Sequence, residues 1–243
     1  MSLTAKLLLS PVLVAQALCT RARMPRLPEA AGERTGEVGR GPRLRLLILG
    51  DSSAAGVGVA RQSESLSGHL TRALAAKCAA RVRWQLMARS GLTSARCLQW
   101  LQSEAPAPAD LAVVVLGVND VVEQVPSRHA VGARESIANH LRNAHGVAHV
   151  IFAPLPPVSR FPGLPQPLRW IAGADARRHD AAVAAWAAGR DDVSHVPIDL
   201  PLNRGVMARD GFHPGEPVYR VCGVALAEHI AAAVWPRLRP NAA

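Results

Sequence analysis

The segment LRLLILGDSSAAGVG, residues 44–58, decides the predicted fold. Its apolar half has the length and the nearly continuous Leu/Ile character of a strand that is buried on both faces of a parallel sheet. The run stops at Gly50-Asp51-Ser52 and gives way to small residues, which indicates a tight turn with Ser52 at the carboxyl end of the strand. Ligands bind at that edge of open α/β sheets, so Ser52 is a candidate nucleophile.

Length and composition indicate one globular domain. The chain has 243 residues, of which 49% are hydrophobic and 19% are charged, as in ordinary globular proteins. The net charge of +10 comes from 26 Arg and 2 Lys spread along the whole chain, with no basic run interleaved with aromatic residues. We therefore predict no specific nucleic-acid partner, and only non-specific attraction to anionic surfaces.

The first 43 residues differ in composition from the rest and are predicted to lie outside the main domain, residues 44–243. Residues 7–19 are mostly apolar, but a membrane-spanning helix needs about 20 such residues. The stretch fits a cleaved signal peptide, a helix in peripheral contact with a membrane surface, or a helix packed on the domain. The sequence leaves these three open, and the localisation with them. Residues 25–43, rich in Pro, Gly, Glu and Arg, are expected to form an irregular connector.

From residue 44 onward, short apolar strands alternate with helices. The expected strands are residues 44–49, 82–88, 111–116, 147–152 and 193–198, and the longer expected helices are residues 63–80, 127–145, 168–188 and 217–235. This alternation predicts a three-layer α/β/α sandwich, flavodoxin-like, with about five parallel strands. The Pro-rich segment 154–167 has no regular period and is expected to form a wall or lid of a functional site.

Polar residues among glycines follow three of these strands, and a fourth polar loop precedes the last helix. They are Ser52, Gly91, Asn119 and the pair Asp210 and His213. Because parallel strands deliver their carboxyl ends to one edge, we expect these residues to converge. Acyl transfer needs a hydroxyl, an imidazole that takes its proton and a carboxylate that orients the imidazole. It also needs oxyanion donors, which the N–H groups of Ser52 and Gly91 and the Asn119 amide are expected to supply.

The four blocks resemble those of the SGNH (GDSL-type) hydrolases, a family of serine esterases and lipases. They read Gly50-Asp51-Ser52-Ser53, Gly91, Gly117-Val118-Asn119-Asp120 and Asp210-Gly211-Phe212-His213, in this order across residues 44–235. The resemblance implies a flavodoxin-like catalytic domain. It implies Ser52 as nucleophile, His213 as base, Asp210 as its orienter, and an oxyanion hole of Ser52, Gly91 and Asn119. The sequence departs from the family name at Ser53, where the family has Leu, which bears on the shape of the pocket rather than on the chemistry.

We predict a serine esterase that hydrolyses a small carboxylic ester, or transfers its acyl group, through an acyl-enzyme, without a metal or an organic cofactor. The substrate pocket is expected to include Ser53, Val118, Val121, Phe161 and Trp170. The four cysteines, Cys19, Cys78, Cys97 and Cys222, lack the spacing of a metal site. The last three fall in expected helices and are interpreted as small core residues.

A different class of function remains open at this point. A non-catalytic flavodoxin-like module binding an anion or a nucleotide at the first strand–helix turn would use Gly56 and Gly58 to cradle phosphate. The turn lacks the Lys-Ser/Thr that completes a P-loop. The physiological substrate, the choice between hydrolysis and acyl transfer, and the oligomeric state are not predicted.

Overall fold

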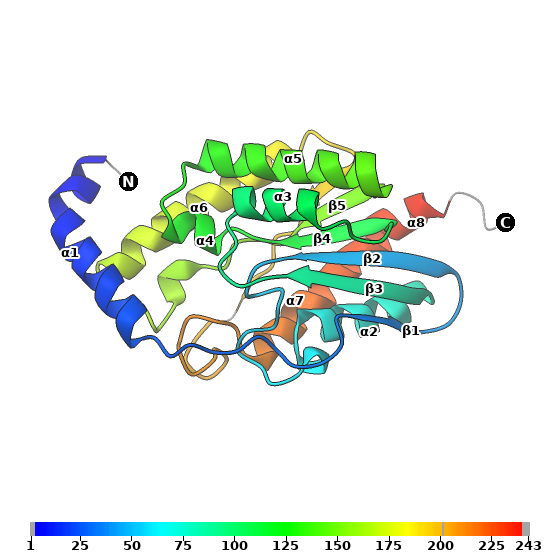
Figure 1. The fold of residues 1–243 in the computed structure, drawn as a ribbon, viewed down its shortest axis with the longest axis horizontal. Helices are drawn as coiled ribbons and strands as arrows, with labels where there is room; N and C mark the ends of the chain where they lie inside the picture. Colours follow the sequence, from blue (N-terminus) through cyan, green and yellow to red (C-terminus); the bar gives the residue numbers. More distant parts are fainter. Residues whose placement is uncertain (1–2, 201, 240–243) are drawn as a thin grey trace.

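The strand predicted around residues 44–49 lies inside a six-stranded sheet with the order β1-β3-β2-β4-β5-β6 (Figure 1). The computed structural model describes residues 3–200 and 202–239, with side chains from residue 8 onward. The strands are β1 (Thr35–Val38), β2 (Arg43–Gly50), β3 (Arg81–Ala88), β4 (Leu111–Val115), β5 (His149–Phe152) and β6 (Val193–His195). The five strands β2 to β6 are parallel, which confirms the predicted flavodoxin-like α/β sheet.

Side chains of β2 alternate between two hydrophobic cores, as the pleat of a strand requires. Leu44, Leu46 and Ile48 enter the core on one face of the sheet, and Leu47 and Leu49 enter the core on the other. All five are at most 1% exposed. Full burial of a Leu or Ile side chain contributes about 1.5–3 kcal/mol, so this strand is a main contributor to the stability of the sheet.

Helices cover both faces of the sheet (Figure 1). They are α1 (Leu3–Arg23), α2 (Leu66–Cys78), α3 (Ser94–Ser103), α4 (Val118–Val122), α5 (Ser127–His145), α6 (Leu168–Ala187), α7 (Glu216–His229) and α8 (Trp235–Leu238). A π-helical turn, Ile230–Val234, joins α7 to α8, and short 3₁₀ turns lie at Gln62–Glu64 and Val158–Arg160. α2 and α7 pack together on one face, and α3, α5 and α6 form the layer on the other.

The expected irregular connector contains an edge strand. β1 pairs with β3 in the antiparallel direction, with Thr35 opposite Gln85 and Val38 opposite Val82. The boundary predicted at residue 44 therefore falls within the sheet-forming part of the chain. Four residues with a central glycine carry too little hydrophobic alternation to be distinguished from a loop, and their strand conformation depends on the free edge of β3.

The first helix, α1, packs with one side against α6 at one end of the molecule (Figure 1). Gln16 fixes this contact, because its Nε2 donates to the Gln166 carbonyl at 2.6 Å and its Oε1 accepts from the Leu168 N–H at 3.0 Å. Among the residues searched, one helical stretch, Glu216–Leu238, is long and apolar enough to span a membrane, and α1 is not such a stretch. It contains Leu226 and Ile230, both fully buried in the core against the sheet, which accounts for its composition.

The topology places β2 between β3, which follows it in the chain, and β4 on its other side. The chain direction across the sheet reverses at this strand, and ligands of open α/β sheets bind outside the carboxyl end of such a strand. Ser52 lies immediately beyond that end, two residues after Gly50.

Candidate active site

The turn after β2 holds Ser52 through hydrogen bonds of the neighbouring residues. The Asp51 N–H donates to the Val115 carbonyl of β4 at 3.1 Å, which extends the ladder between β2 and β4 by one bond. The Asp51 carboxylate then accepts from the Ser53 N–H at 2.9 Å, an Asx turn around the serine. These contacts leave the Ser52 side chain directed outward at the rim of the sheet.

His213 and Asp210 come from the loop before α7 and meet Ser52 across 161 positions of sequence. His213 Nε2 lies 3.1 Å from Ser52 Oγ, and His213 Nδ1 lies 2.6 Å from Asp210 Oδ2. Asp210 Oδ1 accepts a further 2.9 Å bond from each backbone N–H of Phe212 and His213. The three side chains therefore form one hydrogen-bonded line from hydroxyl to carboxylate.

Hydrogen bonding keeps Asp210 ionised. Burial by itself would raise the pKa of this carboxyl, but the bond from His213 and the two backbone N–H groups outweigh it and lower the pKa below its ordinary value. The carboxyl group is fully shielded from solvent, whereas the imidazole is 18% exposed. With the carboxylate on Nδ1, the imidazole presents Nε2 to the Ser52 hydroxyl.

Two glycines bring the loop of His213 and the turn of Ser52 together. Gly58 has φ +108°, and a Cβ at this position would collide with the Pro214 carbonyl. Gly211 has φ +64°, and a Cβ there would lie 2.7 Å from the Gly163 nitrogen. Both positions combine a left-handed backbone with close packing, which glycine alone tolerates. The Gly163 N–H also donates to the Gly211 carbonyl at 2.9 Å, so the Pro-rich segment braces the histidine loop.

The three predicted oxyanion donors differ in whether they already donate hydrogen bonds within the protein. The Ser52 N–H has no hydrogen-bond acceptor among the described residues and is free to bind an oxyanion. Asn119 lies close by, but its Nδ2 donates to Asp51 Oδ2 and to the Leu92 carbonyl, both at 3.1 Å. Since an amide NH₂ carries two hydrogens, Asn119 must share one of them with an oxyanion. Gly91 is exposed in the turn before α3 with φ +83°, and its role stays a prediction.

Asp51 is a buried carboxyl that the sequence analysis treated only as part of a motif. Burial raises its pKa from 3.8 to about 6, against the lowering effects of the Ser53 N–H and the charge of His213. Its two oxygens hold the turn of Ser52 on one side and Asn119 on the other. Asp51 therefore couples the nucleophile turn to one of the oxyanion donors.

A second buried network lies behind Asn119 and was not predicted. Asp120 accepts from the Ser94 N–H at 2.9 Å and from Ser94 Oγ at 2.6 Å. Arg134 of α5, only 1% exposed, donates from Nη2 to the Leu116 carbonyl at 3.1 Å and contacts Asp120 Oδ2 at 3.3 Å. This network fixes α4, which carries Asn119, to α3, the helix that follows Gly91.

No sequence signal identifies Arg134 as buried, because an arginine on an amphipathic helix is ordinarily exposed. A Cβ on Gly117 would collide with the Arg134 guanidinium, so the glycine of the Gly-Val-Asn-Asp block makes room for this side chain. That glycine is the one feature of the sequence that hints at a large neighbour.

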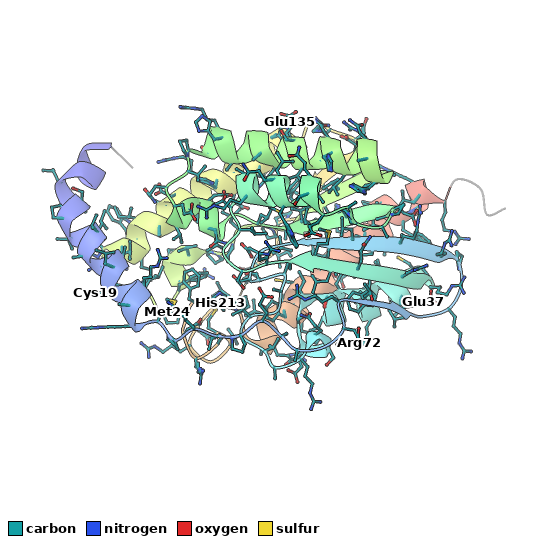
Figure 2. All side chains as sticks on the ribbon, viewed as in Figure 1. Cys19, Met24, Glu37, Arg72, Glu135 and His213 are labelled. Atoms are coloured by element: carbon teal, nitrogen blue, oxygen red, sulfur yellow. The ribbon has the colours of Figure 1, made fainter. Side chains whose placement is uncertain are left out.

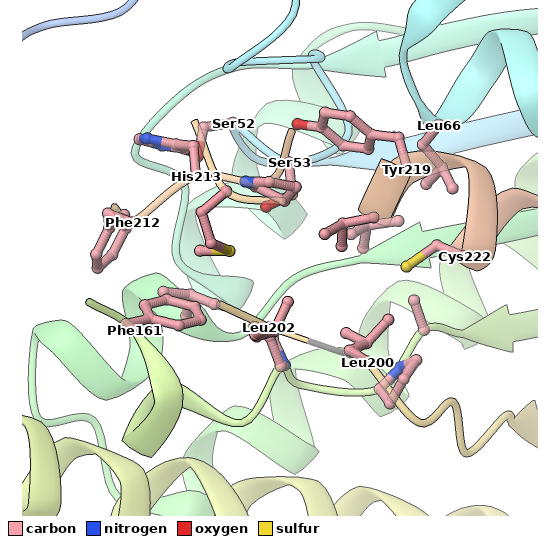
Figure 3. Close-up of a pocket in the computed structure, with 18 of the residues that line it drawn as sticks. Ser52, Ser53, Leu66, Phe161, Leu200, Leu202, Phe212, His213, Tyr219 and Cys222 are labelled. Carbon is pink, nitrogen blue, oxygen red and sulfur yellow. The ribbon is translucent and has the colours of Figure 1, made fainter. Parts of the chain in front are cut away.

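A pocket opens beside Ser52 and His213 and continues into the molecule (Figure 3). Of the predicted pocket residues, Ser53, Val118 and Phe161 line it. Val121 does not, because it is 2% exposed and packs in a core cluster with Leu155. Trp170 does not either, because it lies on the first turn of α6 with 49% of its surface exposed. These two placements correct the sequence-based expectation.

Seven of the residues that line the pocket come from segments with no predicted role in the site. They are Leu200, Leu202 and Met207 from the loop after β6, and Val218, Tyr219, Cys222 and Leu226 from α7. The loop residues have no period that reveals which way they face. The α7 residues follow helical spacing, which is also the pattern of a core helix, so the cavity between them is invisible in the sequence.

The comparisons with known proteins agree with this geometry. Residues 48–221 match the model of the GDSL-like lipase/acylhydrolase family. The GDSL-like esterase Rv1075c of Mycobacterium tuberculosis is 28% identical over 184 residues, which cover 72% of this chain and 58% of that protein. The chain thus spans less than two thirds of the length of this curated relative.

Solved structures share the fold. The lipase Lip_vut3 from a goat rumen metagenome superposes with a TM-score of 0.61 and 19% identity, covering 81% of this chain and 100% of that chain. The acetylxylan esterase Axe2 of Geobacillus stearothermophilus gives a TM-score of 0.59 and 18% identity, covering 81% and 97%. Similarity at this level of identity concerns the architecture alone.

Proposed function

Because this chain belongs to the GDSL-like lipase/acylhydrolase family, whose members hydrolyse carboxylic esters, we propose that it is a serine esterase working through an acyl-enzyme on Ser52. His213 is the general base and Asp210 its orienting carboxylate. The Ser52 N–H and the Asn119 amide stabilise the oxyanion. The roles rest on the positions of these groups around one rim of the sheet.

The reaction has two halves with balanced proton transfers. Ser52 Oγ attacks the ester carbonyl while His213 Nε2 takes its proton, and the tetrahedral intermediate collapses when Nε2 returns that proton to the departing alcohol. A water molecule then attacks the acyl-enzyme in the same way and releases the carboxylic acid and free Ser52. An alcohol in place of this water would give acyl transfer.

One observation carries the proposal: the unbroken line of hydrogen bonds from Ser52 Oγ through His213 to Asp210, at 3.1 and 2.6 Å. Both separations lie within the reach that proton transfer requires. An imidazole with a buried carboxylate behind it and a hydroxyl in front is the arrangement that converts a serine into a nucleophile.

The alternative of an anion-binding or nucleotide-binding module has less support. The residues after Ser52 form turns, and α2 begins only at Leu66, so no helix N-terminus follows the first strand to bind a phosphate. Close packing explains the glycine at position 56, because a Cβ there would lie 2.7 Å from Ala30 and 2.8 Å from Ser65. Gly58 packs against Pro214 in the same way.

The test is steady-state hydrolysis of p-nitrophenyl butyrate by the full chain and by Ser52→Ala. Loss of a catalytic nucleophile typically lowers kcat by about 10⁶-fold, so Ser52→Ala is expected to fall to the uncatalysed background. Ser136→Ala, the same change on the exposed face of α5, is the matched control and should retain full activity. Undiminished turnover by Ser52→Ala would reject the mechanism.

A further inference from the structure

The pocket behind Ser52 is an internal slot rather than an open groove. It runs from the catalytic pair to Cys222 and Leu226 on α7, with Leu200 on the opposite wall (Figure 3). Leu226 is fully buried, yet it lines the slot, so the far end is closed by the core of the protein. A group that enters past Ser52 therefore meets a dead end inside the fold.

The walls of the slot offer almost nothing polar. Its polar residues, Ser52, Ser53, Asn119 and His213, belong to the catalytic rim. Tyr219 contributes its ring, because its hydroxyl is engaged by donation to the Val57 carbonyl at 2.7 Å. A hydroxylated or charged acyl group would lose its water there without gaining a partner, at a cost of about 1–3 kcal/mol for each polar group.

The size of the slot limits what it admits. Its volume is about 70 Å³. One water-sized group needs about 10–15 Å³ of such space, so the slot holds roughly five to seven of them. A methylene group is close to a water molecule in size, so a space of this capacity, enclosed between α7 and the loop after β6, suits a single unbranched chain.

We propose that this slot binds the acyl chain of the substrate, and that the preferred substrate is the ester of an unsubstituted, unbranched acid of about five to seven carbons. The proposal rests on the esterase function above and adds the acyl specificity. Cys222 limits the length of the acyl chain, because its thiol faces the slot and it lies midway among the α7 residues that line the slot. Burial raises the pKa of this thiol to about 12, so Cys222 is a neutral apolar wall in the acyl-enzyme.

A series of p-nitrophenyl esters from acetate to dodecanoate tests the specificity. We expect kcat/KM to rise from acetate to a maximum near hexanoate and to fall at decanoate and dodecanoate. A branched ester of equal carbon number, 2-ethylbutanoate, should react about 10–200-fold more slowly than hexanoate, the range for a misfit of one small group in an apolar pocket. If kcat/KM decreases steadily from acetate to dodecanoate, the slot does not bind the acyl chain, although the esterase mechanism would still hold. Absence of hydrolysis throughout would instead reject the esterase function.

Substitutions of Cys222 test whether this residue sets the preferred length of the acyl chain. Cys222→Leu fills the slot and should move the maximum to shorter esters, with hexanoate losing about tenfold or more in kcat/KM, while Cys222→Ala should move it to longer ones. Val224→Leu on the same helix, outside the slot, is the matched control. Acetate hydrolysis reports whether the Cys222 variants remain folded and active. An unchanged chain-length profile in both Cys222 variants would overturn the assignment.

A second inference comes from α1, a different part of the molecule. Apart from its contact with α6, this helix stands out from the body of the protein (Figure 1). Its outward side carries Leu8, Val12, Val14 and Leu18, with exposures of 80%, 46%, 58% and 63%. Large apolar side chains gathered on one exposed side of a helix mark a contact surface, and no described part of the chain covers this side.

The charged residues next to the apolar side of α1 indicate what kind of surface it contacts. Arg21, Arg23 and Arg26 follow the apolar stretch and are exposed. The first acidic residue of the chain is Glu29, so the apolar side chains are bordered by cations alone. Each basic residue near a membrane surface that contains anionic lipids contributes about 1 kcal/mol of attraction.

A different side of α1, the one that carries Gln16 and Cys19, lies close to the loop of Asp210. A groove of about 580 Å³ between them is lined by Cys19 and Arg23 of α1, by Leu164 and by Asp210. α1 therefore lies beside the loop that carries Asp210 and His213 (Figure 2).

We infer that α1 docks the protein on the surface of an anionic lipid bilayer, with its apolar side among the acyl chains and its arginines at the headgroups. Co-sedimentation of the full chain with vesicles tests this. We expect binding to vesicles of equal parts phosphatidylglycerol and phosphatidylcholine, weaker binding to pure phosphatidylcholine, and release at high salt.

Matched variants separate docking from non-specific attraction by the net positive charge. Val14→Asp combined with Leu18→Asp should abolish sedimentation, whereas Ala76→Asp, on an exposed position of α2, should not. p-Nitrophenyl butyrate hydrolysis should be unchanged in all of them. Equal sedimentation of the α1 variant and the Ala76 control would overturn docking through α1. Resistance to alkaline carbonate extraction would overturn surface docking in favour of a helix that crosses the bilayer.

Discussion

The hydrogen-bonded line at the rim of the sheet and the Asp120–Arg134 network beneath it differ in location and in exposure to solvent. Ser52, His213 and Asp210 lie on loops at the rim of the sheet, and the imidazole is partly exposed. Asp120 and Arg134, one layer deeper, are each 1% exposed and are held by buried hydrogen bonds. The rim supplies groups that exchange protons, whereas the layer beneath it supplies charges that stay where they are.

This difference predicts which substitutions should lower the rate of hydrolysis and which should lower the stability of the fold. A change at the rim removes a reacting group without leaving an unpaired charge in the interior, so it should lower the rate with little loss of stability. A change in the buried layer leaves a charge without a partner in the interior, which is strongly destabilising. The predictions below test this division, from the largest expected effect to the smallest.

Asp210→Asn should lower kcat by about 10⁴-fold, because an amide in place of the carboxylate favours the wrong imidazole tautomer. The midpoint of urea unfolding should change little. Hydrolysis of p-nitrophenyl butyrate and urea denaturation followed by circular dichroism measure the two effects, with Asp191→Asn on the surface as control. A variant that keeps its rate would remove Asp210 from the mechanism.

Arg134→Met should destabilise the fold by about 3–5 kcal/mol, because it leaves the Asp120 carboxylate buried without its cation. Combining it with Asp120→Asn should recover part of that loss. Urea denaturation of the single and double variants measures the coupling, and Arg128→Met, exposed on the same helix, serves for comparison. Additive losses in the double variant would show that the pair is not coupled.

Asn119→Ala should lower kcat by about 10²–10³-fold through loss of one oxyanion donor. This position lies between the two layers, since its amide is bonded to buried Asp51 and to the Leu92 carbonyl. We therefore expect a moderate loss of stability as well. Parallel kinetics and denaturation, with Asn143→Ala as control, measure both. A loss of stability without a loss of rate would assign Asn119 to the structure alone.

Asp51 gives the smallest effect, a dependence of stability on pH. Its pKa of about 6 is raised above the ordinary 3.8, so the folded protein binds the proton more tightly than the unfolded chain. The stabilisation is therefore fully present at low pH and is lost as the pH rises through about 6. From about pH 4.5 to 7, this contribution to the free energy of unfolding should fall by about 2 kcal/mol.

Urea denaturation of the wild type and of Asp51→Asn across this range isolates the contribution. The difference between the two proteins should shift by that amount in favour of the variant as the pH rises. A difference that does not vary with pH would show that the Asp51 carboxyl has the same pKa in both states.

The sequence predicted the parts of the molecule that have strong local patterns. The apolar runs of β2 and β4 and the helix at Ser127–His145 were predicted because buried parallel strands and an amphipathic helix have distinct periods. Ser52, Asp210 and His213 were predicted together because parallel strands end on one edge. The features that escaped prediction depend on partners distant in the chain.

Trp170 and Arg134 show this limit in opposite directions. A tryptophan near a Pro-rich segment was expected to face a pocket, but it is exposed on α6, the helix that α1 contacts. An arginine on an amphipathic helix is ordinarily exposed, but Arg134 is buried because Asp120 and the Leu116 carbonyl lie beneath it. Neither environment is encoded within one helical turn of the residue itself.

Trapping the covalent intermediate tests the central claim most directly. The enzyme is treated with a fluorophosphonate, digested, and mapped by tandem mass spectrometry, with the Ser52→Ala variant treated in parallel. We predict one phosphonylated residue, Ser52, and no modification of the variant. Modification of Ser53 or of another serine, or no adduct in an enzyme that hydrolyses esters, would contradict an acyl-enzyme on Ser52.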